Sequence, residues 1–129
     1  MNLGYVIVYV SDVEKTVQFY EDCLGVKRRF VHESGQYAEM ETGSTALAFV
    51  SDELASSNFD APYTRNKAAA EAGGFEVVFV VDDVADAYAK AIENGATRLA
   101  EPTRKPWGQW VAYVRDCNGV IVELASSLS

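Results

Sequence analysis

The sequence has few of the residues on which redox chemistry, transition-metal binding and nucleophilic catalysis usually depend. It contains two cysteines, Cys23 and Cys117, and a single histidine, His32. With one distant histidine, no Ser/His/Asp or Cys/His catalytic pairing is supported. The N-terminal segment lacks the basic and long apolar regions of a secretory signal, and so few thiols without such a signal are more often reduced than paired. These features favour a cytoplasmic protein.

Long apolar runs and clusters of positive charge are also missing. The apolar segments are short and interrupted, so none is long enough to span a membrane. The formal net charge is −8, whereas nucleic-acid binding normally requires a basic stripe that displaces counterions. The nearest approach to such a stripe is Arg104-Lys105, which is more typical of a solvated turn. We therefore expect neither a membrane nor a nucleic acid as a partner.

What the chain does contain is an internal repeat. Residues 5–13 and 76–84 each combine an apolar strand pattern with an aspartate that is a good helix N-cap, Asp12 or Asp83. The two segments are in register, because 76 − 5 and 83 − 12 both equal 71. Apolar residues at helical spacing follow each aspartate and end at a glycine. Such a repeat predicts two copies of one structural unit.

The local patterns extend each copy to a βαβββ module. The first module has a predicted helix that ends at Leu24-Gly25, and predicted strands at residues 3–10, 27–31, 36–41 and 45–50. The second has a predicted helix that ends at Asn94-Gly95, and predicted strands at residues 75–81, 97–100, 109–114 and 120–125.

These modules predict a single domain over residues 1–129, with the modules at residues 1–50 and 75–129. Residues 51–74 between them are long for a connection in a compact domain, so they form either a linker or a lid. Within this segment, residues 67–72 could form a helical turn. The sequence leaves open whether the segment is a lid.

The modules and two longer motifs resemble the vicinal oxygen chelate superfamily, which includes glyoxalases, bleomycin-resistance proteins and extradiol dioxygenases. The motifs are Val-Ser-Asp-Val-Glu with Phe-Tyr-Glu-Asp-Cys-Leu-Gly in the first module, and Arg-Asp-Cys-Asn-Gly-Val-Ile-Val-Glu-Leu at the end of the second. Cys117 stands where the family commonly has proline. The resemblance implies an α+β fold of two tandem βαβββ modules, whose curved mixed sheets surround a cavity. It also implies a homodimer, with modules that pair either within one chain or between chains.

Metal-using relatives take four ligands from the first and last strands of both modules, and these positions fall on Tyr5, Ala48, Glu76 and Glu123. Only Glu123 is a residue that the family uses at its position, and Ala48 has no donor atom. One histidine cannot supply the iron site of an extradiol dioxygenase, which needs two. We expect no metal and no other cofactor, although two carboxylates can hold Mg²⁺ together with several waters.

The carboxylates of Glu76 and Glu123 are the sharpest candidates, because each lies in an apolar strand on the face that the family turns inward. A buried carboxylate needs a partner or a raised pKa. Two alternatives stay open: a cationic or hydrogen-bond-donating ligand, or a structural ion pair with Arg28, Arg65, Arg98 or Arg115. With the aromatic candidates, the expected ligand-binding residues are Tyr5, Ala48, Phe49, Glu76, Trp107, Trp110 and Glu123.

Together these features predict a protein that binds a small aromatic or cationic organic molecule without a metal, as drug-sequestering relatives do. The alternative is a lyase or isomerase in which Glu76 or Glu123 is the general base, with or without a divalent metal. A third possibility is a closed cavity and a role in protein interaction only. The identity of the ligand is not readable from the sequence.

Overall fold

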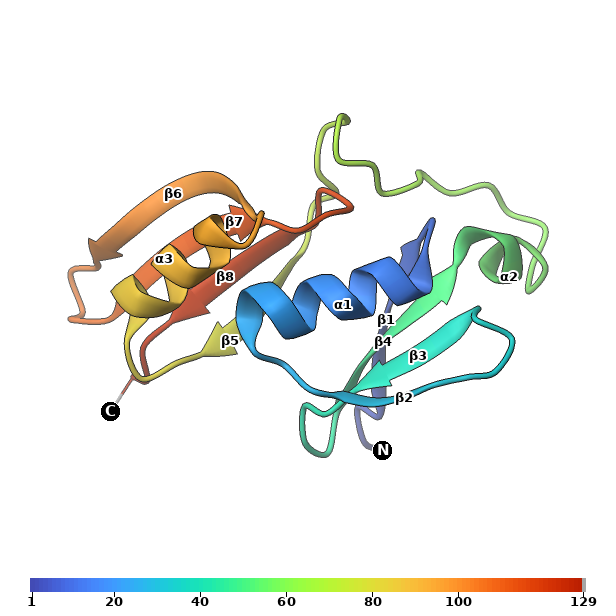
Figure 1. The fold of residues 1–129 in the computed structure, drawn as a ribbon, viewed down its shortest axis with the longest axis horizontal. Coiled ribbons are helices and arrows are strands. Elements are labelled where there is room, and N and C mark those ends of the chain that lie inside the picture. Colours follow the sequence, from blue (N-terminus) through green and yellow to red (C-terminus); the bar gives the residue numbers. More distant parts are fainter. Residues whose placement is uncertain (129) are drawn as a thin grey trace. The chain divides into compact units, whose positions relative to one another are not determined.

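The computed structural model describes residues 1–128, so the last residue of the expected domain lies outside the described part (Figure 1). The chain divides into two compact units, of which the first ends at Asn66 and the second begins at Lys67. This boundary falls inside residues 51–74, the segment between the two predicted modules. Each unit is therefore described by itself.

The first unit contains a mixed four-stranded sheet with strand order β1-β4-β3-β2, in which β1 and β4 are parallel and the other pairs are antiparallel. Its elements are β1 (Tyr5–Val10), α1 (Val13–Leu24), β2 (Arg28–Val31), β3 (Tyr37–Met40), β4 (Ala46–Ser51) and α2 (Asp52–Ser56).

The second unit repeats this topology with the order β5-β8-β7-β6, and β5 and β8 are its parallel pair. Its elements are β5 (Glu76–Val80), α3 (Val84–Glu93), β6 (Thr97–Arg104), β7 (Trp110–Arg115) and β8 (Ile121–Ala125). The prediction of an α+β fold with two tandem βαβββ modules is thus confirmed.

The two long helices begin where the repeated aspartates predict. The Asp12 carboxylate accepts a hydrogen bond from the Lys15 amide at 3.0 Å, and the Asp83 carboxylate accepts one from the Asp86 amide at 3.0 Å. Each bond satisfies one of the amides that the first helical turn leaves without a partner. Gly25 ends α1 with φ at 66°, a left-handed conformation that glycine adopts without strain.

Each long helix covers one face of its own sheet (Figure 1). In the first unit Val17 and Tyr20 of α1 are fully buried, and the Tyr20 ring lies 5.0 Å from the ring of Phe49 on β4. In the second unit Val84 and Tyr88 of α3 are buried on the corresponding side. Because strand residues alternate between faces, the other face of each sheet is not covered by the long helix of its own unit. We call it the helix-free face.

Three parts of the chain differ from the sequence prediction. Helix α2 was not predicted, because five residues are too short for a helical period; Ser51 begins it by accepting from the Leu54 amide at 3.1 Å. Residues 67–72 contain only a turn, closed by the Ala70 amide on the Lys67 carbonyl. Strand β6 continues past Pro102 to Arg104, since an edge strand tolerates a residue without an amide hydrogen.

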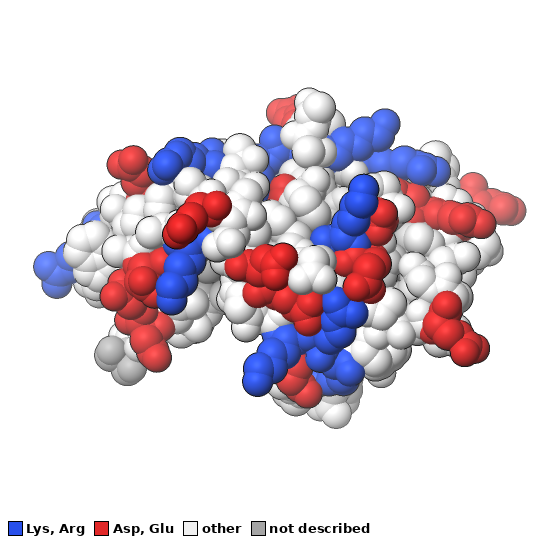
Figure 2. All heavy atoms as spheres, in the orientation of Figure 1, with Lys and Arg blue, Asp and Glu red and all other residues white. Residues whose placement is uncertain are grey.

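No helix among the described residues is long and apolar enough to cross a membrane. On the face shown in Figure 2, lysine and arginine side chains are interspersed with acidic ones. Several of them form ion pairs: Arg28 contacts Glu14 at 3.0 Å and Glu21 at 2.9 Å. On that face the described residues therefore present mixed charge.

Candidate functional site

The strongest candidate site lies on the helix-free face of the second sheet. Strands β5 and β8 are paired in parallel, with Glu76 opposite Ile121 and Val78 opposite Glu123. Residues two apart on a strand share a face, so Glu76 and Glu123 point to the same side from adjacent strands. The structure thus brings together the two carboxylates that the sequence analysis singled out.

A third polar side chain, the phenol of Tyr113, belongs to the same group. Tyr113 lies on β7 directly opposite Glu123, so it shares the helix-free face. Burial, followed by hydrogen bonding to Glu123, raises the pKa of Tyr113. A hydroxyl that stays protonated over the physiological range remains a hydrogen-bond donor beside the carboxylate. We call Glu76, Glu123 and Tyr113 the carboxyl cluster.

The Glu123 carboxyl perturbs the titration of Glu76. Hydrogen bonding to Glu123 raises the pKa of Glu76, and burial and the like charge of Glu123 act in the same direction. Glu76 is an exposed residue and Glu123 is half-buried, so the expectation of deeply buried carboxylates is not met within this unit. The hydrogen bond between the two carboxyl groups, more than desolvation or the like charge, therefore makes Glu76 hold its proton to higher pH.

Within the described part of the second unit, no basic side chain neutralises the cluster. Among the described residues, neither Glu76 nor Glu123 forms an ion pair with a lysine or arginine. Three of the four arginines considered from the sequence have other partners: Arg28 pairs with Glu14 and Glu21, Arg65 with Asp52, and Arg115 donates to the carbonyls of Gly119 and Ala70. Of the two readings left open above, the structural ion pair loses support.

The positions at which relatives hold a metal do not supply its usual donors. Tyr5 and Ala48 lie on β1 and β4 of the first unit, where Ala48 is opposite Ile7 and has no donor atom. Within residues 1–128, no three histidine, cysteine, aspartate or glutamate side chains form a group able to hold a metal ion. Since this donor set does not fit the metal that the family implies, we derive no chemical step through one.

The helix-free face of the first sheet carries a carboxylate that the sequence analysis did not select. Glu39 on β3 is buried, accepts from the Tyr37 hydroxyl at 2.7 Å and forms an ion pair with Arg29 at 3.1 Å. Burial and then the bond to Glu39 raise the pKa of Tyr37 to about 12. The spacing of Tyr37 and Glu39, two residues apart on a predicted strand, could have indicated that they share a face. It did not indicate which arginine would form an ion pair with Glu39.

Two of the aromatic candidates, Phe49 and Trp110, lie on the helix-covered faces of their own sheets, and a third, Trp107, lies in a turn. Phe49 is 0% exposed and packs against Tyr20 of α1. Trp110 lies at the start of β7, and strand alternation turns it to the opposite face from Tyr113. Trp107 is in the turn before β7 and 64% exposed, with its indole N–H donating to the Gln109 amide oxygen at 2.9 Å.

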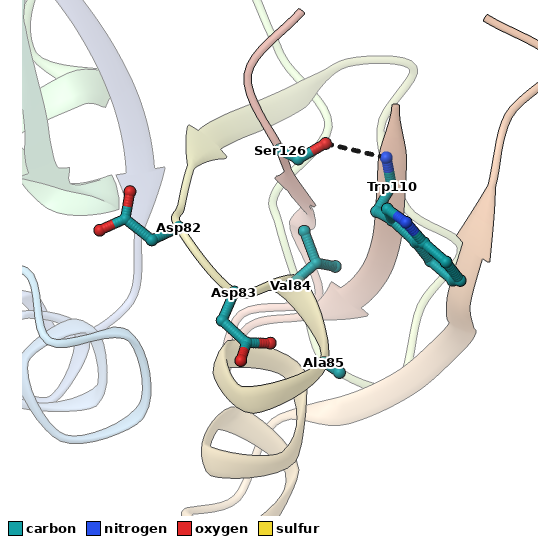
Figure 3. Close-up of a pocket in the computed structure, with 6 residues that line it drawn as sticks. All are labelled: Asp82, Asp83, Val84, Ala85, Trp110 and Ser126. Carbon is teal, nitrogen blue, oxygen red and sulfur yellow. Dashed lines mark hydrogen bonds between the residues drawn. The ribbon is translucent and has the colours of Figure 1, made fainter. Parts of the chain in front are cut away.

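Trp110 instead borders a shallow cleft at the start of α3, shown in Figure 3. The cleft has a volume of about 270 Å³, and it is lined by Asp82, Asp83, Val84, Ala85, Trp110 and Ser126. Two of the lining residues are joined by a hydrogen bond, in which the Trp110 amide donates to the Ser126 hydroxyl at 2.9 Å. The side chains of Asp82 and Trp110 point in opposite directions in Figure 3, so they do not converge on one ligand position.

Comparison with known proteins places this geometry in a family. Residues 2–124 match the model of the Glyoxalase/Bleomycin resistance protein/Dioxygenase superfamily. The chain is 28% identical over 129 residues to the uncharacterised protein YraH of Bacillus subtilis (strain 168), an alignment that covers 99% of this chain and 100% of YraH.

Two solved structures share the fold. A glyoxalase-related enzyme from Fulvimarina pelagi superposes with a TM-score of 0.84 at 18% identity, over 98% of this chain and 88% of that one. A protein of unknown function from Agrobacterium tumefaciens str. C58 superposes with a TM-score of 0.79 at 23% identity, over 98% and 94%. Because the family model matches residues 2–124, nearly the whole of this chain, the chain belongs to the glyoxalase/bleomycin resistance protein/dioxygenase superfamily.

Proposed function

We propose that the protein binds a small organic molecule that carries a cationic, hydrogen-bond-donating group, and that Glu76 and Glu123 receive this group. The observation that carries the proposal is a pair of adjacent carboxyls that no lysine or arginine neutralises. A cationic ligand would balance the negative charge of the two carboxylates. Its N–H groups would donate hydrogen bonds to them in place of the proton that they share.

The surroundings of the pair favour a ligand with an apolar body. Val78, the direct neighbour of Glu123 on the helix-free face, is 47% exposed, and Val80 is 68% exposed. A few polar groups beside apolar surface are typical of small-molecule sites. We therefore propose an aromatic or aliphatic amine or amidine, bound without chemical change, as in sequestration of a toxic compound.

Binding can be tested with matched probes of one shape. Isothermal titration calorimetry should show that benzamidine, a planar cation, binds more tightly than benzamide, its neutral analogue. The double variant Glu76→Gln, Glu123→Gln should lose this preference, while Asp82→Asn, which removes one exposed acid from the other face, should retain it. Equal affinity of wild type for the two probes would contradict the proposal.

The raised pKa of Glu76 favours one alternative, a lyase or isomerase in which this carboxylate is the general base. A general base works best when its pKa lies near the working pH, and the shift of Glu76 is in that direction. A turnover that Glu76→Gln abolishes with little change in ligand affinity would support the enzyme. Loss of affinity without any turnover in wild type would support the binding protein.

We also propose that the protein binds its ligand without a metal. Because Ala48 has no donor atom, we expect the purified protein to contain no stoichiometric zinc, nickel, iron or manganese. Elemental analysis of protein purified without chelators gives the answer. About one bound metal per chain, lost in Glu123→Gln, would show that the site is metallated.

We also propose a homodimer. Exposed apolar side chains gather on the helix-free faces, including Tyr5 at 58%, Ile7 at 45% and Val80 at 68%. Apolar surface of this kind is typical of an interface. Light scattering at micromolar concentration should give twice the monomer mass, and a monomer would contradict the proposal.

A further inference from the structure

The segment that follows α2 is bound to the first unit by very few contacts. None of the backbone amides of residues 59–66 donates to another backbone group, in contrast to the strands and helices around them. Residues 57–62 are all exposed, and Phe59 is 45% exposed. A segment without backbone hydrogen bonds can detach locally at small cost in free energy.

Ser57 and Asn58 are still bonded to the carbonyls of α2, and what holds residues 59–66 is a small set of side-chain contacts, chiefly to Asp52 and Tyr9. The Tyr63 hydroxyl donates to the Asp52 carboxylate at 2.6 Å, and Arg65 lies 3.9 Å from the same carboxylate. The Tyr63 ring meets the Tyr9 ring edge-on at 5.0 Å, and the Asn66 side-chain amide donates to the Tyr9 carbonyl at 3.0 Å. We call these contacts of Tyr63 and Asn66 the latch.

The latch anchors are themselves rigid. Asp52 is 5% exposed at the start of α2, and Tyr9 belongs to β1, which is paired along its length with β4. The latch can therefore open and close against a fixed frame without disturbing the sheet. A buried carboxylate that accepts from a hydroxyl makes a stronger bond than a neutral pair does, which favours the closed position.

The latch closes over one end of the helix-free face of the first sheet. Tyr5, Ile7 and Tyr9 point to this face, because the alternate residues Val8 and Val10 are buried on the other side. Along this row Tyr5 is 58% and Ile7 45% exposed, whereas Tyr9, beneath Tyr63, is only half-exposed. The covered end is thus the one at which the segment docks.

We propose that residues 59–66 are a lid, which the Tyr63 and Asn66 latch closes over the Tyr9 end of the helix-free face of the first sheet. The lid opens as a unit while the sheet and α2 stay folded. It separates residues 51–74 into a lid that belongs to the first unit and a connection, from Lys67 on, that belongs to the second. The lid does not depend on the carboxyl cluster, which lies in the other unit.

Limited trypsin digestion tests local opening, because Arg65 is a cleavage site inside the lid. We expect Tyr63→Phe, which keeps the ring and removes the hydroxyl, to accelerate cleavage after Arg65 about tenfold, the effect of losing one charge-assisted hydrogen bond. Tyr37→Phe is the matched control, since it removes a hydroxyl that donates to Glu39 of the same unit and not to Asp52, the anchor of the latch. Cleavage after Arg65 in the control should equal that of wild type.

The urea dependence of cleavage separates a lid from unfolding of the unit. Local opening exposes little surface, so the rate after Arg65 should depend only weakly on urea. A dependence as steep as that of global unfolding, or equal acceleration by Tyr63→Phe and Tyr37→Phe, would overturn the proposal. No acceleration in Tyr63→Phe would equally overturn the latch.

Nitration by tetranitromethane tests what the lid covers. Tyr9 should be modified faster in Tyr63→Phe than in wild type, and in parallel with the cleavage after Arg65. Tyr5, on the same strand and face but outside the lid, is the internal reference and should keep its rate. A Tyr9 to Tyr5 ratio that does not change in the variant would show that the lid does not cover this end of the sheet.

Discussion

The helix-free faces of the two units carry the same kinds of side chain in different electrostatic states. In the first unit a tyrosine and a carboxylate, Tyr37 and Glu39, are joined by Arg29, which neutralises the charge. In the second unit Tyr113 and Glu123 are joined by a second carboxyl, Glu76, which adds to it. One repeat thus completes its polar network with its own residues, whereas the other leaves a charge for something else to balance.

This difference indicates how a duplicated unit can divide its tasks. A buried carboxylate with an arginine and a hydroxyl around it is satisfied and stabilises its sheet. Two carboxylates that lie side by side on one face repel each other, which lowers the stability of the fold. Such locally unfavourable arrangements are expected at functional sites. The contrast supports the proposal that the cationic group of a ligand binds to the second unit.

The largest expected effect comes from neutralising one carboxylate in each unit. Glu39→Gln leaves Arg29 with one partner fewer and should lower the free energy of unfolding by about 2 kcal/mol. Glu123→Gln removes a like-charge contact and should change it by no more than about 0.5 kcal/mol. Urea unfolding of the two variants measures the difference. A larger loss in Glu123→Gln would show that the second cluster is structural too.

The pH dependence of stability should differ in sign between the units. The folded protein holds the Glu76 proton to higher pH than the unfolded chain, so Glu76 reduces stability as pH rises from 4.5 through its raised pKa. Glu76→Gln should therefore gain stability relative to wild type over that range. A difference between wild type and Glu76→Gln that stays constant with pH would contradict the raised pKa of Glu76.

Glu41 in the first unit provides the opposite case. The hydrogen bond from Arg29 lowers the pKa of Glu41, so the folded state releases this proton at lower pH than the unfolded chain. Its contribution to stability is complete above pH 4.5 and is lost as pH falls through the lowered pKa. Glu41→Gln should therefore be less stable than wild type at neutral pH, with a difference that vanishes in acid. Unfolding midpoints over a pH series compare both variants directly.

The smallest expected effects concern two tyrosine hydroxyls. Tyr37→Phe removes a bonded hydroxyl and should cost about 1 kcal/mol, whereas the Tyr88 hydroxyl in α3 is buried without a hydrogen-bond partner among the described residues. Tyr88→Phe should therefore raise the free energy of unfolding by about 1 kcal/mol. Thermal unfolding of the two variants gives opposite shifts if the hydroxyls differ in this way. Destabilisation by Tyr88→Phe would show that a partner such as a bound water satisfies it.

Local sequence was enough to predict the repeat, the caps of α1 and α3 at Asp12 and Asp83, and the succession of helix and strands along the chain in each module. These features depend on neighbours within a few residues and on the side-chain period of strand and helix, which a sequence displays directly. Helix α2 was missed because a single turn shows no period, and the end of β6 was misplaced because Pro102 resembles a strand terminator.

The sequence by itself determined that the chain has two βαβββ modules, that its charge is acidic, and that its donors depart from the metal set of the family. Only the tertiary structure showed that Glu39 forms an ion pair with an arginine, whereas Glu123 lies beside the carboxyl of Glu76. It also showed that Phe49 and Trp110 lie on the helix-covered faces of their sheets. Those contacts join residues from different strands, and a partner across a sheet depends on register and pairing order. A linear pattern specifies which face a residue occupies but not which neighbour it meets there.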